Sequence, residues 1–248
     1  VGIVAIEIAL TDILRELKIV PDYIIGHSVG ELGCAYADNC LTAQETLLAA
    51  YARGEASRES QTIRGAMAAV GMNHLKLKAI VPNDIDIACH NGEDSSTISG
   101  PVESIHDFID KLKEDKVFVK EVACSGVPLH SRYIKEMGQN LHNKLKQIIK
   151  KPKMRSEKWL SSTYAEEMWK VDEAAFCSAE YQTKNLLNPV LFKEVTEMLP
   201  NDVLLIEVAP SGLLRAILTR NVNHGAYMNL TERNSKDGFN HLMEGLGR

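Results

Sequence analysis

Apolar residues open the chain at the spacing of an amphipathic helix, which we expect over residues 3–17. A short apolar run at 23–25 then predicts a strand, and small residues predict a helix over 31–37. Residues 42–45 read Thr-Ala-Gln-Glu, a capping box, so a second long helix should run over 43–60. Helix and strand alternate here as in an α/β core. The expected core stripe of the first helix consists of Ile3, Ile6, Leu10, Ile13, Leu14 and Leu17.

The pattern changes after residue 65 to shorter units in a β-α-β-β-α-β order, which is that of a ferredoxin-like subdomain. We expect Asn91 and Gly92 at the turn between its second and third strands. The predicted strands cover 66–72, 85–90, 96–99 and 117–122, and the predicted helices cover 74–80 and 102–114.

Downstream of this subdomain the chain returns to longer elements, with a long helix, a helix over 189–199 and a buried strand over 203–208. These predict an α/β fold in which residues 1–62 and 125–248 form an α/β-hydrolase-like core and residues 63–124 form the inserted ferredoxin-like subdomain. The chain has no initiator methionine and enters a helix at once. We therefore expect it to begin inside a longer polypeptide, with the N-terminal part of the core outside it.

Composition narrows the classes of function. The 248 residues are 45% hydrophobic, enough to bury a large core, and the net charge of -5 argues against a nucleic-acid surface. The five cysteines have no Cys-x-x-Cys spacing, which argues against a disulfide framework or a zinc site and favours the cytoplasm. No apolar run is as long as a membrane span. We expect a cytoplasmic protein without a metal.

Residues 26–30, Gly-His-Ser-Val-Gly, join the predicted strand to the helix after it. A glycine-flanked turn there lifts the Ser28 hydroxyl clear of the backbone at a helix N-terminus, where peptide dipoles favour developing negative charge. Ser28 is therefore the candidate nucleophile. Because the pentapeptide is short, a serine in an ordinary tight turn stays open as the alternative.

A serine nucleophile needs a base, and histidine is the usual one. His130 lies in a loop restrained by glycine and proline between a predicted strand and a helix, a junction that fixes a side chain near a cleft. His27 is too close to Ser28 along the chain, so we assign it to packing of the turn. The histidines expected on solvated helix faces are His106, His142 and His241.

No aspartate occupies the expected position before a late histidine, as a hydrolase triad requires. A Ser-His dyad whose imidazole is oriented by a backbone carbonyl is therefore favoured. We expect that carbonyl in the loop 209–212.

Arg53 lies on the predicted capped helix with only small residues three, four and seven positions away. Small neighbours leave room for an acidic ligand, and the planar guanidinium can hold a carboxylate by two hydrogen bonds. An arginine that pairs within the packing or reaches solvent is the open alternative.

With these residues in place, the chain resembles the malonyl/acetyl-transferase domain of animal type I fatty acid synthase, and more broadly the acyltransferases of polyketide synthases and bacterial malonyl-transferases. The resemblance covers almost the whole chain. The matching segments are 26–31, 35–38, 50–54, 65–71, 88–91, 98–101, 129–131, 179–181, 185–186, 189–190 and 207–210.

The resemblance implies a role for each site residue. Ser28 would be the acyl nucleophile, His130 its base and acid, and Arg53 the partner of the malonyl carboxylate. The amide of Val29 would be one oxyanion donor, and Asn91 would bind substrate. A second oxyanion donor in the family comes from a glutamine in an N-terminal Gly-x-Gly-x-Gln motif, which this chain lacks.

The resemblance also implies the reactants. Malonyl-CoA and acetyl-CoA would be substrates, and the phosphopantetheine thiol of an acyl carrier protein would accept the acyl group; the domain itself would hold no cofactor. Leu129 stands where malonyl-selective members carry phenylalanine, so methylmalonyl units could also be accepted. The parent enzyme is expected to be a homodimer with a ketosynthase and other domains in the same polypeptide.

Three alternatives remain open at this point. A polyketide synthase acyltransferase shares all of these motifs. A serine hydrolase of esterase or thioesterase type shares the Ser-His pair but gains nothing from Arg53. A docking domain without activity would not need Ser28, His130 and Arg53 together.

Overall fold

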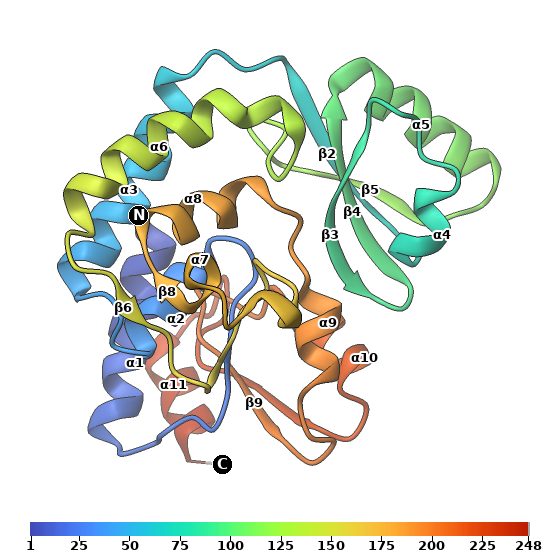
Figure 1. Cartoon of the computed structure of the whole chain (residues 1–248). Helices are drawn as coiled ribbons and strands as arrows, with labels where there is room; N and C mark the ends of the chain where they lie inside the picture. The colour runs from blue at the N-terminus through green and yellow to red at the C-terminus, as the bar shows by residue number, and fades with distance from the viewer. Residues whose placement is uncertain (248) are drawn as a thin grey trace.

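The computed structural model describes residues 1–247. Figure 1 shows two parts, a larger body in which helices surround short pairs of strands, and a smaller sheet with two helices beside it. Within residues 1–247, every helix is too short or too polar to cross a membrane.

The larger body contains most of the helices. The predicted capping box is confirmed: the Thr42 side chain accepts from the Glu45 amide, and the Glu45 carboxylate accepts from the Thr42 amide, which starts α3 at Ala43. The helices of this body are α1 (Gly2–Glu16), α2 (Gly30–Ala37), α3 (Ala43–Glu59), α6 (Lys135–Ile148), α7 (Asp172–Ala175), α8 (Ala179–Leu187), α9 (Phe192–Glu197), α10 (Arg215–Asn221) and α11 (Gly238–Leu246), with 3-10 turns at Arg132–Ile134 and Glu166–Met168.

The strands of the larger body form three separate pairs among the described residues. β1 (Ile24–Ile25) pairs in parallel with β7 (Trp159–Leu160), and β9 (Leu204–Glu207) pairs in parallel with β10 (Ala226–Asn229). β6 (Lys153–Met154) and β8 (Phe176–Cys177) are antiparallel. The strand expected over 203–208 is present, but the prediction that it is buried is wrong, since Leu204 is 55% exposed. A two-stranded sheet leaves most of its surface uncovered.

The helix expected over 3–17 is confirmed as α1, but its buried face follows the expected stripe only in part. Leu10 is buried as expected, and Ile13 and Leu14 are half-buried. Ile3, Ile6 and Leu17 are exposed, whereas Val4 and Ile8, outside the expected stripe, are buried on the side of α2 and α3. Adjacent faces of α1 are both apolar, so the period alone cannot decide which one packs.

The smaller sheet has the strand order β3-β4-β2-β5, and all neighbouring strands are antiparallel. Helix α5 packs against it through Ile105, Phe108, Ile109 and Leu112, which are buried. Figure 1 shows α4 and α5 on one side of this sheet. Its elements are β2 (Gly65–Val70), α4 (His74–Lys78), β3 (Asp86–Gly92), β4 (Ser95–Pro101), α5 (Val102–Glu114) and β5 (Val119–Val122).

The expected turn at Asn91 and Gly92 is wrong. Both residues lie within β3, and the chain reverses at Glu93 and Asp94. The carbonyl of Asn91 accepts a hydrogen bond of 2.7 Å from the Asn221 side chain, a contact from a distant helix that holds Asn91 in the strand. A local turn signal cannot include such a contact.

Residues 188–191 join the two parts of the molecule. Val190 forms a parallel bridge with Cys89, through bonds of 2.9 Å from the Val190 amide to the Ala88 carbonyl and 2.8 Å from the His90 amide to the Val190 carbonyl. The chain is extended there, so the helix expected over 189–199 begins only at Phe192. This bridge attaches the edge strand β3 to the larger body.

Candidate active site

Ser28 occupies a sharp turn between β1 and α2. Its φ of 54° lies in the left-handed region that side chains other than glycine seldom adopt. The chain closes tightly behind it, because a Cβ on Gly26 would lie 2.7 Å from the Cys34 sulfur and 2.7 Å from the Glu31 nitrogen. The expected strand-turn-helix presentation of the serine is therefore present in the structure.

A buried carboxylate fixes the start of α2 behind the serine. Glu31 is fully buried and accepts hydrogen bonds from the Ser162 amide at 2.9 Å, the Ser162 hydroxyl at 3.0 Å and the Tyr181 hydroxyl. Burial raises the pKa of Glu31, against the opposing effect of these hydrogen bonds. Because Ser162 follows β7, this network also ties α2 to the strand that pairs with β1.

His130 meets Ser28 at hydrogen-bond distance. The Ser28 Oγ lies 2.7 Å from Nε2 of His130, and Nδ1 of His130 lies 2.9 Å from the carbonyl oxygen of Asn188. A carbonyl only accepts, so Nδ1 carries the proton and Nε2 is left to accept from the serine hydroxyl. The prediction of a dyad oriented by a backbone carbonyl fits this geometry, but the expected source at 209–212 is wrong.

The His130 imidazole is held in its neutral form. Burial, and to a smaller extent the nearby Arg53 cation, lower its pKa to about 3. His130 is only 3% exposed. A neutral imidazole with a free Nε2 can take the serine proton without first losing one of its own.

This gives a prediction for the pH dependence of Ser28. We expect its rate of modification by a small fluorophosphonate to change little between pH 8 and pH 5, because His130 stays neutral. An imidazole with an ordinary pKa of about 6.5 would be only about 3% neutral at pH 5 and would slow the reaction about 30-fold. Quenched samples followed by mass spectrometry measure the rate.

The same lowered pKa sets the control for that experiment. An unfolded chain protonates His130 near pH 6.5 and the folded chain does not, so the free energy of unfolding falls as the pH drops below about 6.5. Circular dichroism at each pH therefore has to show a folded chain. A 30-fold loss of rate with the fold intact would contradict a neutral His130.

Arg53 is half-buried on α3, and among residues 1–247 its guanidinium pairs with no carboxylate. Its Nη1 donates a hydrogen bond of 2.6 Å to Oδ1 of Asn185. Burial lowers the Arg53 pKa to about 10, so the group is still charged at neutral pH. A desolvated cation that lacks an acidic partner is suited to bind an anion.

Thr163 links the arginine and the histidine. Its Oγ1 accepts a hydrogen bond of 3.1 Å from the side-chain amide of Asn185, and its carbonyl accepts one of 3.1 Å from the side-chain amide of Asn188. Asn185 lies in the last turn of α8 and Asn188 caps that helix. One helix end therefore orients both side chains, through Asn185 to the Arg53 guanidinium and through Asn188 to the His130 imidazole.

Sequence reasoning missed these two asparagines as positioning residues. Asn185 lies in one of the family-like segments, and its type was the only available signal. Asn188 acts through its backbone carbonyl, which every residue type has, so its identity carries no information about that contact.

The Asn91 side chain contacts His27, in the turn that carries Ser28. Its Oδ1 lies 2.9 Å from Nε2 of His27, and its side-chain amide donates 3.0 Å to Thr97 Oγ1. His27 also packs edge-on against Phe192, with ring centroids 5.1 Å apart. His27 therefore packs within the turn at Ser28, as expected. The oxygen and the nitrogen of the Asn91 side chain both already form hydrogen bonds within the protein.

The remaining two site predictions concern Val29 and Leu129. The Val29 amide precedes α2 and, in the described part of the chain, donates to no backbone or side-chain acceptor. It is therefore free to receive an oxyanion. Leu129 is half-buried and packs against core residues of the larger body, directly before His130.

A cleft of about 680 Å³ opens between the smaller sheet and the larger body. His130, Ser131, Leu187 and Pro189 line it from the larger body. From the smaller part it is lined by α4, by the chain before β3 and by β3 itself, including His74 and His90. Of the predicted site residues, His130 and not Ser28 or Arg53 lines this cleft.

Comparison with known proteins places this chain in a family. The family model described as the acyl transferase domain matches residues 1–242. The chain is 30% identical over 257 aligned residues to the highly reducing polyketide synthase gloL of Glarea lozoyensis, which covers 99% of the chain and 10% of that protein. It is 34% identical over 221 residues to the highly reducing polyketide synthase rstn3 of Aspergillus nomiae, and this alignment covers 86% of the chain and 9% of that protein.

Solved structures agree at the level of the fold. A loading acyltransferase from the avermectin modular polyketide synthase aligns over 99% of this chain and 77% of its own, with a TM-score of 0.85 and 21% identity. The acyltransferase domain of phenolphthiocerol/phtiocerol synthase A from Mycobacterium bovis (BCG) aligns over 94% and 90%, with a TM-score of 0.82 and 21% identity. The mixed α/β prediction is confirmed as this acyltransferase fold.

These relatives are polyketide synthases, so the resemblance to animal fatty acid synthase is supported only for the acyltransferase domain itself. The chain spans about a tenth of the length of the curated relatives it matches. The Ser-His pair, the fold and the family match agree, and the chain belongs to the acyl transferase domain family.

Proposed function

We propose that this chain transfers a short acyl group from coenzyme A to the phosphopantetheine thiol of an acyl carrier protein, through an ester on Ser28. The observation that carries this proposal is the half-buried Arg53 cation, which has no acidic partner in the described chain and lies close enough to His130 to lower its pKa. A malonyl carboxylate is the anion that fits a guanidinium at this place.

The proposed reaction uses one base twice. Nε2 of His130 takes the Ser28 proton while Oγ attacks the thioester carbonyl, and the Val29 amide donates to the oxyanion. His130 then protonates the departing CoA thiolate. In the second half the carrier thiol gives its proton to His130 and attacks the acyl ester, and His130 returns the proton to Ser28 as the acyl group leaves.

We infer that the two parts divide near residues 62 and 124, with residues 1–62 and 125–248 as an α/β-hydrolase-like core and 63–124 as a ferredoxin-like subdomain. The strand order β3-β4-β2-β5 and the two helices beside that sheet support the second assignment. The cleft between the parts would receive the thioester arm of either substrate.

The relatives favour polyketide assembly over fatty acid synthesis as the setting, which is the alternative that the motifs had left open. We propose that the whole protein is a large synthase in which this domain serves an acyl carrier domain and works beside a ketosynthase, in a homodimer. Leu129 is smaller than phenylalanine, so malonyl, acetyl and methylmalonyl units are all proposed substrates.

Arg53→Ala gives a test of the carboxylate partner. We expect malonyl transfer to fall about 10- to 100-fold, since hydrogen bonds to a charged group contribute about 1.5–3 kcal/mol. Acetyl transfer should survive or rise, because an acetyl group has no free carboxylate for Arg53 to bind. Transfer of each labelled acyl group to a purified carrier protein measures both rates.

Arg58→Ala is the matched control, because Arg58 lies on the same helix but is exposed and pairs with Glu55. It should leave both rates unchanged. Equal losses of malonyl and acetyl transfer in the Arg53 variant would reject the carboxylate role. Free malonate in place of malonyl-carrier as the main product of the unchanged chain would instead favour a hydrolase.

A further inference from the structure

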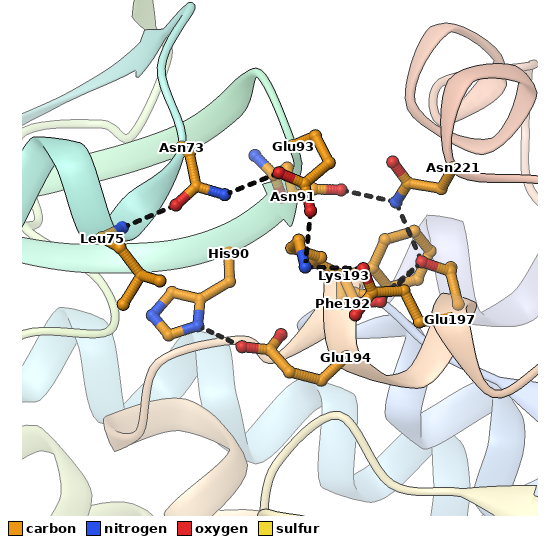
Figure 2. A network of polar contacts seen from close by, with 11 residues as sticks. Asn73, Leu75, His90, Asn91, Glu93, Phe192, Lys193, Glu194, Glu197 and Asn221 are labelled. Carbon is orange, nitrogen blue, oxygen red and sulfur yellow. Dashed lines mark hydrogen bonds and ion pairs between the residues drawn. The ribbon is translucent and has the colours of Figure 1, made fainter.

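Three metal-ligating side chains from three elements meet at the junction of the two parts. His74 begins α4, His90 lies on β3, and Glu194 lies on α9 of the larger body. One ligand atom from each lies within 4.8 Å of the others. Figure 2 shows His90 and Glu194 directed toward one another, with Nδ1 of His90 2.6 Å from Oε1 of Glu194.

Two polar atoms of this group lack partners among residues 1–247. Oε2 of Glu194 and Nδ1 of His74 are both shielded from solvent and form no hydrogen bond there. A buried polar atom without a partner destabilises the fold, because it has lost its hydrogen bond to water and gained none in return. The carboxylate oxygen and the imidazole nitrogen are therefore both available as ligand atoms.

We propose that His74, His90 and Glu194 bind a divalent transition-metal ion of the Zn²⁺ class. Two imidazole nitrogens and one carboxylate oxygen are a ligand set that Zn²⁺ accepts, with a fourth position for water. Mg²⁺ and Ca²⁺ prefer oxygen ligands, so two imidazoles select against them. This inference is independent of the acyl transfer proposed for Ser28.

Binding requires a small rearrangement of the two rings. The imidazoles of His74 and His90 are stacked 3.7 Å apart at an interplanar angle of 3°. A ligand nitrogen binds a metal in the plane of its own ring, about 2.0–2.1 Å away, so the parallel rings must tilt open. Nδ1 of His90 must also give up its proton before the ion can bind there, and Nε2 can carry that proton instead.

The charges around the cluster permit a cation. Lys193 is next to Glu194 in sequence, but its ammonium group is paired with Glu93 at 2.9 Å and with Glu197 at 2.6 Å. Figure 2 shows this lysine held between those carboxylates. In the described part of the chain, no lysine or arginine pairs with the Glu194 carboxylate. Its negative charge is therefore available to a metal ion.

A bound ion would join the smaller sheet to α9. Two ligands come from α4 and β3, the third comes from the larger body, and His74 and His90 line the same cleft as His130. We therefore expect the ion to stabilise the fold and to restrict movement of the cleft walls.

The test is a titration of the full chain, stripped with EDTA and free of any affinity tag. Calorimetry with ZnCl₂ should show one ion per chain, and the melting temperature should rise with Zn²⁺ but not with Mg²⁺. Glu194→Gln and His90→Ala should each weaken binding at least about tenfold, since each removes one of three protein ligands. The absorption spectrum of the chain with bound Co²⁺ should show no signature of a thiolate ligand.

His106→Ala is the matched control, because His106 lies on α5 of the smaller part and is only loosely paired, 3.6 Å from an exposed Glu121. It should bind Zn²⁺ like the unchanged chain. Glu194→Gln is nearly isosteric, and its melting temperature in EDTA has to match the unchanged chain so that misfolding cannot explain lost binding. Absence of Zn²⁺ binding, binding that survives both variants, or a thiolate signature with Co²⁺ would overturn the proposal.

Discussion

Ser28→Ala should carry no acyl group after incubation with malonyl-CoA or acetyl-CoA, whereas the unchanged chain should gain one acyl mass on Ser28. The reason is that the Ser28 hydroxyl is the group 2.7 Å from the base. Without this hydroxyl no ester can form at residue 28, and only slow background transfer is left. Intact-mass measurement followed by peptide mapping detects the acyl group.

His130→Ala completes that experiment. It keeps the hydroxyl but removes the proton acceptor, so we expect acylation of Ser28 to slow about 10⁴-fold or more. The double variant should be no slower in overall transfer than either single one, because the two side chains act as a unit. An acyl group found on Ser28→Ala, or additive losses in the double variant, would contradict the assignment.

Gly26→Ala should lower the melting temperature and slow Ser28 acylation, although the substitution adds a single methyl group. That carbon would lie 2.7 Å from the Cys34 sulfur and 2.7 Å from the Glu31 nitrogen, so the backbone of the turn has to move. Overpacking of this kind costs about 1–3 kcal/mol, which is about 2–12 °C for a chain of this size. A displacement of about 1 Å at the nucleophile costs about 10²-fold in rate.

Gly30→Ala is the control within the same pentapeptide. A Cβ on Gly30 meets nothing within 4 Å, and the residue begins α2, where alanine is the better helix former. Its melting temperature should stay the same or rise slightly. Differential scanning calorimetry compares the two variants, and an equal decrease for both would show that the tight approach at Gly26 is not what the turn requires.

Local signals in the sequence identified the elements whose physics is local. The capping box at Thr42 and the glycine-flanked turn at Ser28 each depend on residues within a few positions, and both are present in the structure. The buried face of α1 is the opposite case, because which residues are buried depends on where α2 and α3 lie.

The candidate site residues could be selected from the sequence, whereas the residues that support them could not. Ser28, His130 and Arg53 are selected by residue type and local pattern, and the structure brings His130 close to the other two. The carbonyl that orients His130 comes from Asn188, 58 residues further along the chain, and the partner of Arg53 is 132 residues away. Neither contact has a pattern in the sequence.

The bridge between Val190 and Cys89 has a mechanical consequence for the base. The carbonyl that fixes the tautomer and direction of the His130 ring belongs to Asn188, only two residues before the point where β3 is bonded to the body. The same short backbone segment therefore holds β3 and orients Nε2 of His130 toward Ser28. In the proposed reaction, the alignment for proton transfer thus depends on how the smaller sheet packs on the larger body.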